Sequence, residues 1–243
     1  GGLLLIRFLL YRWFRDQIEE NLNDRYNKQV DASFRIGMFW FIASEVFFYL
    51  TFIGPVYYIR AIDVPWLGRE GYLGPTHEIL YGGTFEAMWP TSGPGELGGE
   101  FTPMGPWGIP AINTLLLLSS GATLTWAHWG LKVDNQKQLI WGLAATIALG
   151  LLFVVLQAYE YGHAYSELNL TLGTGGYGST FYMLTGFHGF HVTMGAIMLI
   201  AILGRAMKSH FSAHNHFAFE AVAWYWHFVD VVWLGLFVFV YWL

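Results

Sequence analysis

Five apolar stretches of the chain are long enough to cross a membrane as α-helices, and polar or Gly/Pro-rich segments separate them. A span of about 20 apolar residues, at ~1.5 Å per residue, covers a hydrocarbon core about 30 Å thick. The pattern therefore predicts an all-α fold, a polytopic bundle of transmembrane helices. The predicted full spans are residues 36–58, 109–131, 139–159, 178–203 and 217–243.

The first residues form a shorter apolar stretch that ends in charged side chains. Residues 1–11 are too few to span a membrane, and they lead directly into Arg12 and Arg15. This order is typical of a helix that leaves the bilayer. We therefore expect residues 1–15 to be the end of a truncated transmembrane helix, and residues 16–243 to form a five-helix bundle.

Three segments between the spans are expected to lie in water. Residues 16–35 are polar, residues 60–108 form a long Gly/Pro-rich loop, and residues 160–177 contain two Glu and no Lys or Arg. If the spans alternate, ten of the 12 Lys and Arg residues fall on one side of the membrane, and only Arg60 and Arg69 fall on the other. The positive-inside rule places the basic side in the cytoplasm or matrix and the loop 60–108 outside.

The third span carries an edge of small residues. Gly142, Thr146 and Gly150 recur at four-residue spacing. Small side chains at this spacing let two helices approach closely within a membrane. We expect this edge to pack against a neighbouring helix.

The last span holds three ionisable residues in its first half. At ~100° per residue, His227 lies about 20° and Asp230 about 80° from Glu220 around the helix, so the three share one face. Exposing such groups to lipid, or burying them without partners, costs several kcal/mol. This face is therefore predicted to turn toward other helices.

Other ionisable residues lie within or beside the remaining spans. Glu45 falls about 13 Å into the first full span, close to the bilayer midplane. It is either a functional acid or a protonated, hydrogen-bonded one without chemistry. His188 and His191 have an i,i+3 spacing that favours a polar patch facing another helix. Arg205 and Lys208 form a basic cluster at the inner surface, which fits either anionic lipid headgroups or control of topology.

Composition narrows the chemistry. The 243 residues are 55% hydrophobic and 12% charged, and the net charge of -5 argues against nucleic acid as a partner. The absence of cysteine excludes Fe–S clusters and thiolate zinc or copper sites in this chain. Glu160-x-x-His163 occurs once, whereas di-iron bundles need two such elements, and His188 with His191 on one helix cannot supply opposed haem ligands. We expect no catalytic residue and no metal here.

Six motifs resemble those of subunit III of the aa3-type cytochrome c oxidases, in the same order along the whole chain. No single motif is specific, but the series is. The motifs are RIGMFWFIASEVFF from Arg35, WAH from Trp126, QAYEY from Gln157, YGSTF from Tyr177, TGFHGFHV from Thr185 and EAVAWYWHFVDVVW from Glu220.

The resemblance implies seven transmembrane helices with a cleft between the first two and the other five; this chain would lack the first and most of the second. It also implies a non-catalytic subunit packed on subunits I and II, which carry the haem a and copper. The complex would oxidise cytochrome c, reduce dioxygen to water and pump protons, with this subunit supporting proton uptake. Phospholipid in the cleft would lie near Glu45, His191 and Arg205, which match the family's positions.

Other functions also fit the residues. The nearest alternative is subunit III of a quinol oxidase, although the segment from Trp224 to His227 looks more like the cytochrome c branch. A proton-coupled membrane carrier would use Glu45 and Glu220 as its relay, and a haem protein would use the histidines. The length of the loop 60–108 favours a bacterial inner membrane over the mitochondrial inner membrane.

Overall fold

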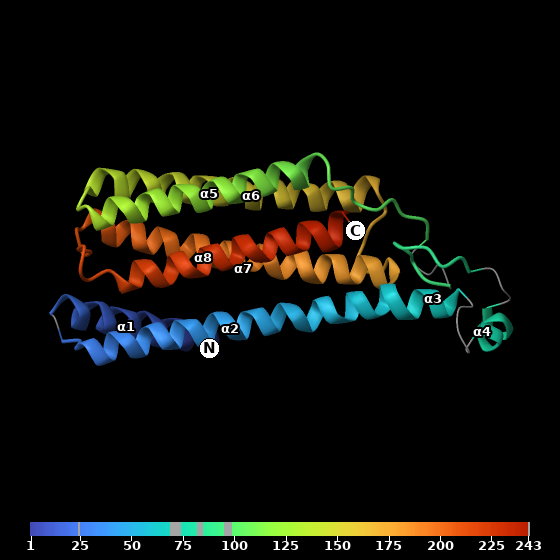
Figure 1. The fold of residues 1–243 in the computed structure, drawn as a ribbon, viewed down its shortest axis with the longest axis horizontal. Helices are drawn as coiled ribbons and strands as arrows, with labels where there is room; N and C mark the ends of the chain where they lie inside the picture. The colour runs from blue at the N-terminus through green and yellow to red at the C-terminus, as the bar shows by residue number, and fades with distance from the viewer. Residues whose placement is uncertain (24, 69–73, 82–84, 95–98, 243) are drawn as a thin grey trace.

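The computed structural model describes the chain except for residues 24, 69–73, 82–84, 95–98 and 243 (Figure 1). The described residues form helices and contain no β-strand, which confirms the predicted all-α fold. Short π-helical segments, Ile59–Asp63 and Phe237–Trp242, follow α2 and α8. The α-helices are α1 (Gly2–Leu22), α2 (Lys28–Tyr58), α3 (Val64–Leu67), α4 (Gly74–Tyr81), α5 (Ile109–Lys132), α6 (Gln136–Glu167), α7 (Gly175–Met207) and α8 (Phe217–Leu236).

Among the described residues, four helices are long and apolar enough to cross a membrane by length and composition. They are α2 continued through α3 (Lys28–Leu67), α6, α7, and α8 with its extension (Phe217–Trp242). The other predicted span, α5, has 24 residues and packs along α6. Asn113 and several Ser and Thr residues lower its average hydropathy.

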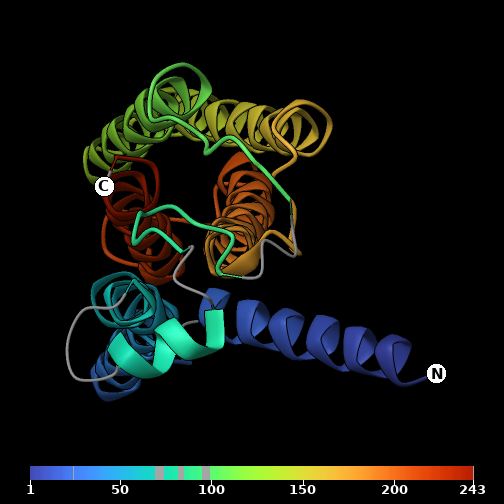
Figure 2. The ribbon, with the colours of Figure 1, turned by 90° about the vertical axis from the view of Figure 1, so that its right-hand side faces the viewer.

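Helices α5 to α8 form the body of the bundle, and α2 lies against α7 and α8 on one side of it (Figures 1 and 2). Helix α1 projects away from the bundle in Figure 2, and none of its residues is buried. In the most apolar window of α2 only 6% of the residues are buried, against 39–44% in α6, α7 and α8. Helix α2 is therefore peripheral and presents most of its apolar surface outward.

The predicted polar linker 16–35 is helical for most of its length. Helix α1 continues to Leu22, and α2 begins at Lys28 after the capping residue Asn27. Helix formation depends on backbone hydrogen bonds and caps, so a helix extends beyond its apolar span when polar residues allow it. Hydropathy therefore located the spans but not the ends of the helices.

Two other predicted loops also contain helix. Helices α3 and α4 occupy part of the segment 60–108. Helix α6 runs to Glu167, so the predicted aqueous loop 160–177 is wrong in its first half, and Glu160 is only 1% exposed. The buried face of α6 continues past its apolar part at a spacing of three to four residues. These buried positions are Phe153, Gln157, Glu160 and Ala164.

Two tryptophans of α8, Trp226 and Trp233, fill the centre of the bundle and are both 0% exposed. The Trp226 indole Nε1–H donates to Oγ of Ser120 on α5 at 2.9 Å. A Cβ atom added to Gly150 of α6 would lie 2.5 Å from the Trp226 ring, and one added to Gly195 of α7 would lie 2.8 Å from it. The ring therefore fits because both neighbouring helices have glycine at this contact. The contact confirms the predicted small-residue edge at Gly150.

Candidate functional site

Two of the predicted site residues meet midway along α2 and α7. Oε2 of Glu45 lies 2.9 Å from Nε2 of His191. Nδ1 of His191 lies 2.6 Å from the carbonyl oxygen of Phe187, one turn earlier in α7, and 3.1 Å from the hydroxyl of Tyr49. A carbonyl oxygen only accepts, so Nδ1 carries a hydrogen. Nε2 and the Glu45 carboxyl group must then share one proton.

Aromatic rings of α2, α7 and α8 pack around this pair. The ring of Phe48 on α2 packs edge-on against Phe187 on α7, with the centroids 5.0 Å apart. Tyr49 is 3% exposed and packs against both His191 and Phe228 of α8. The Glu45 side chain keeps 20% of its surface exposed. The pair therefore lies at the edge of the contact between α2 and the bundle.

Apolar hollows follow the same contact toward the far end of α2. One, with a volume of about 110 Å³, lies between α2 and α7. Its lining residues are Phe52, Pro55, Ser179, Thr180, Met183 and Leu184. None of these residues is ionisable, so the hollow suits a hydrocarbon chain.

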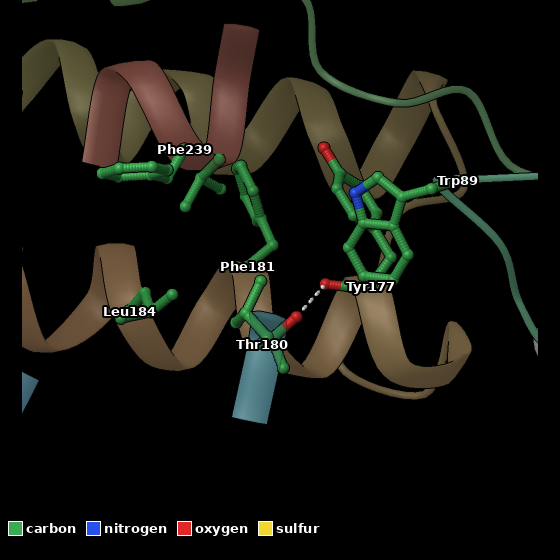
Figure 3. Close-up of a pocket in the computed structure, with 8 residues that line it drawn as sticks. Trp89, Tyr177, Thr180, Phe181, Leu184 and Phe239 are labelled. Atoms are coloured by element: carbon green, nitrogen blue, oxygen red, sulfur yellow. Dashed lines mark hydrogen bonds between the residues drawn. The ribbon is translucent and has the colours of Figure 1, made fainter. Parts of the chain in front are cut away.

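A second, much smaller hollow lies nearby, and four of its eight lining residues are aromatic (Figure 3). The Thr180 hydroxyl donates to the carbonyl oxygen of Tyr177 at 3.1 Å, which satisfies it within α7. The rings of Trp89 and Tyr177 meet edge-on with centroids 5.6 Å apart. The lining residues are Val56, Trp89, Tyr177, Thr180, Phe181, Leu184, Phe239 and Val240. This hollow also offers an apolar surface rather than reacting groups.

His188, the other histidine of the i,i+3 pair, contacts a different helix. It is fully buried, and its Nε2 lies 3.2 Å from the carbonyl oxygen of Val229 on α8. The rings of Phe153 and Trp233 lie 5.5 Å and 5.0 Å from it. The structure therefore directs His188 to α8 and His191 to α2, and does not bring the two imidazoles to one ligand.

Glu220 of α8 is the centre of a second polar cluster. Its Oε2 lies 2.5 Å from Nη1 of Arg35 on α2. Its Oε1 lies 3.3 Å from Nε2 of His216 and 3.7 Å from Nε2 of His128 on α5. The carboxylate thus joins three helices and the segment before α8, at the end of the bundle where α5 meets α6 and α7 meets α8 (Figure 1).

The other two ionisable residues of α8 lie further along the helix and pair with one another. Nδ1 of His227 lies 3.4 Å from Oδ2 of Asp230. Asp230 is 7% exposed and packs against Gly121 of α5, whose added Cβ would lie 2.5 Å from its Oδ2. The His227 side chain is 44% exposed. The face shared with Glu220 therefore turns toward α5, with His227 at its rim.

Arg205 and Lys208 lie at the end of α7, away from the Glu45–His191 pair. The guanidinium carbon of Arg205 lies 4.6 Å from the centroid of the Phe211 ring. Lys208 is exposed. Arg205 lies 14 positions after His191, about 21 Å further along the helix. One phospholipid could reach both only by extending along the length of α7.

Several polar residues in these contacts were not predicted from the sequence. Arg35 lies in the predicted polar segment 16–35, and neither His128 nor His216 was among the predicted site residues. Glu160 was predicted to lie in an aqueous loop but is buried beside Tyr241. The sequence signal for such residues is their position on the buried face of a helix. This position does not show which distant residue will be the partner.

Comparison with known proteins gives a single consistent result. A family model described as "Cytochrome c oxidase subunit III" matches residues 2–243. Relatives named "Cytochrome c oxidase subunit 3" from Latimeria chalumnae, Cyprinus carpio and Ornithorhynchus anatinus are each 43% identical to the chain over 242 residues. Each alignment covers 99% of this chain and 82% of the relative.

Proposed function

The chain belongs to the cytochrome c oxidase subunit III family, and on this premise we propose that it is a non-catalytic subunit of a proton-pumping haem-copper oxidase. The complex would oxidise cytochrome c and reduce dioxygen to water. Subunits I and II would carry the haem a and copper. This subunit would pack on subunit I, hold phospholipid and keep proton uptake efficient.

The observation that carries the proposal is the pairing of Glu45 with His191. A midplane acid that shares its proton with a neighbouring imidazole has its charge satisfied within the protein. The same contact joins the peripheral α2 to α7. This arrangement supports a role in holding a helix and its lipids in place more than a role in chemistry.

Phospholipid binding has separate support from the surface of α2 and α7. The apolar hollow between them is lined by residues such as Phe52 and Met183 and suits an acyl chain. At the end of α7, Arg205 offers a cation of the kind that attracts lipid phosphate. We propose that a lipid acyl chain lies against the hollow. Arg205, at the opposite end of α7, would bind the anionic headgroup of a separate phospholipid.

The membrane is also part of the proposal. The long apolar helices and the family make the chain an integral membrane protein. We propose that it resides in an energy-transducing inner membrane, bacterial or mitochondrial. The relatives named above are vertebrate proteins, whereas the length of the loop 60–108 favours a bacterial source.

Co-purification tests the proposal. The tagged chain would be isolated in mild detergent from membranes of its own source, and its haem, copper and polypeptide content measured. We expect haem a, copper and two larger partner polypeptides in the same peak, with cytochrome c oxidation activity. The proposal would be wrong if no haem-bearing polypeptide accompanied the chain. It would also be wrong if the chain alone held haem or drove proton flux in vesicles.

A further inference from the structure

We propose that His128, His216 and Glu220 bind a divalent cation of the Zn²⁺ type. One ligand atom from each residue lies within 4.8 Å of the others. His128 belongs to α5, His216 to the segment that precedes α8, and Glu220 to the first turn of α8. The cation would therefore tie α5 and α8 together at one end of the bundle.

The hydrogen bonding of His216 leaves its second nitrogen ready to bind a cation. Its Nδ1 lies 3.0 Å from the carbonyl oxygen of Ser212, which only accepts, so Nδ1–H is the donor. Nε2 of a neutral imidazole then directs a lone pair at Oε1 of Glu220, 3.3 Å away. Two acceptors that face one another need either a proton or a metal cation between them. A backbone carbonyl that fixes the tautomer of a histidine is also a common feature of metal-ligating histidines.

His128 presents a second imidazole nitrogen to Glu220, from α5. Its Nε2 is buried, has no hydrogen-bond partner among the described residues, and lies 3.7 Å from Oε1 of Glu220. A buried imidazole nitrogen without a partner is costly. Two imidazole nitrogens from separate segments thus converge on one carboxylate oxygen. A single cation would satisfy all three atoms.

The distances and the ligand types both fit zinc. Zinc–nitrogen and zinc–oxygen bonds of about 2.0–2.1 Å in a tetrahedron place ligand atoms about 3.3 Å apart. The separations of 3.3 Å and 3.7 Å from Oε1 of Glu220 need little movement to reach that value. The ligand atoms of the group are up to 4.8 Å apart, so one imidazole must also move toward the other when the cation binds. Two imidazoles and one carboxylate favour Zn²⁺ over Mg²⁺ or Ca²⁺, which select oxygen ligands. The fourth position would be left for water.

Charges nearby set the strength of the site. Arg35 occupies the other carboxylate oxygen, Oε2, at 2.5 Å, and it also pairs with Asp31 at 2.9 Å. This leaves Oε1 free for a cation while Arg35 offsets part of the negative charge of Glu220. We therefore expect weaker binding than in a closed site of four protein ligands. The site could not be recognised from the sequence, because its ligands come from two helices and the segment before one of them.

The test begins with the unmodified full-length chain in detergent, after chelator treatment. It is titrated with Co²⁺, a spectroscopic substitute for Zn²⁺, and then with Zn²⁺ in equilibrium dialysis. We expect one cation per chain, visible absorption bands of four-coordinate Co²⁺, and X-ray absorption that indicates two imidazoles and oxygen ligands. Absence of a stoichiometric cation would mean that a proton lies between these groups instead, and the proposal would fail.

Two variants then locate the bound cation. His216→Ala removes a ligand, whereas His214→Ala removes an exposed histidine two residues away in the same segment. We expect His216→Ala to weaken Zn²⁺ binding by at least about 10- to 100-fold, a loss typical even of disturbing the groups around a metal ligand. His214→Ala should bind as the unmodified chain does. Equal binding by both variants would overturn the assignment, and size-exclusion profiles check that both remain folded.

Discussion

Nε2 of His191 and Oε2 of Glu45 lie 2.9 Å apart and share one proton across the contact between α7 and α2. Helix α2 has few buried apolar residues, so this pair and the Arg35–Glu220 ion pair make the main polar links between α2 and the bundle. Between helices in lipid, packing and polar contacts replace the hydrophobic effect as the source of association. The position of α2 therefore depends on these polar links together with the aromatic contacts of Phe48 with Phe187 and of Tyr49 with Phe228.

Replacing Glu45 with Gln removes the shared proton and keeps a hydrogen bond, because the amide N–H can donate to Nε2 of His191. We expect oxygen reduction by the complex to stay nearly intact, with a loss of stability of about 1 kcal/mol. Lipid retention and activity over prolonged turnover should decrease. Phospholipid content and the decay of oxygen consumption with time measure both effects.

The matched control for this variant is Glu167→Gln. Glu167 also faces a histidine, His163, at 3.2 Å, but its side chain is 68% exposed. Exposed pairs of this kind contribute little, so the control should behave as the unmodified protein does. Loss of electron transfer in Glu45→Gln, or equal effects in the two variants, would contradict a supporting role for Glu45.

Gly150→Ala tests the fit of Trp226 in the centre of the bundle. The added Cβ would lie 2.5 Å from the rigid indole ring, so the ring or a helix must move. We expect a loss of about 1–3 kcal/mol in unfolding free energy. Gly189→Ala of α7 is the control, because its Cβ would meet no atom within 4 Å. Detergent-denaturant unfolding followed by circular dichroism measures both, and a neutral Gly150→Ala would contradict the packing described.

The bundle could be predicted from the sequence because a bilayer imposes a length on each apolar stretch. Residues 139–159 and 178–203 both lie inside longer helices, α6 and α7. The helix ends could not be predicted, since α6 continues through Glu160 with polar residues on its buried face. Hydropathy measures the preference of a residue for lipid, whereas the end of a helix depends on caps and on the packing of neighbouring segments.

The candidate site was predictable only residue by residue. Glu45 and His191 stand out because charges inside a span need partners. Their contact joins positions 146 residues apart. The sequence does not show how these two helices are placed against one another. The cluster at Glu220 is similar, since His128 and Arg35 reach it from other helices. Pairing depends on the rotation and offset of packed helices, which periodicity alone does not set.

His210 makes the segment between α7 and α8 sensitive to pH. Burial, together with the positive charges of Arg205 and Lys208, lowers the pKa of His210 below its ordinary value of 6.5. Above that pH the imidazole is neutral whether the segment is folded or locally unfolded. Below it, the locally unfolded segment takes up a proton first, so the folded segment loses stability as the pH falls. We therefore expect faster amide hydrogen exchange in residues 208–216 at acidic pH, after correction for the intrinsic exchange rates. His210→Gln should suppress this increase.

Arg205 is expected to hold the headgroup of an anionic phospholipid. Its guanidinium group packs over the ring of Phe211, and its Nε is buried without a hydrogen-bond partner among the described residues. A buried donor of this kind needs an acceptor, and a lipid phosphate at the membrane surface supplies one. Arg205→Ala should therefore release anionic lipid. One basic residue near the surface contributes about 1 kcal/mol, which corresponds to about a fivefold change in occupancy.

Lys208→Ala separates a specific contact from general attraction to the membrane surface. Lys208 carries the same charge three residues further on and is exposed. Native mass spectrometry of the two variants would count the phospholipids that remain bound to each. A larger loss in Arg205→Ala means that the lipid recognises the oriented guanidinium group. Equal losses mean that charge alone attracts the headgroup, and Arg205 would then have no special place in the lipid site.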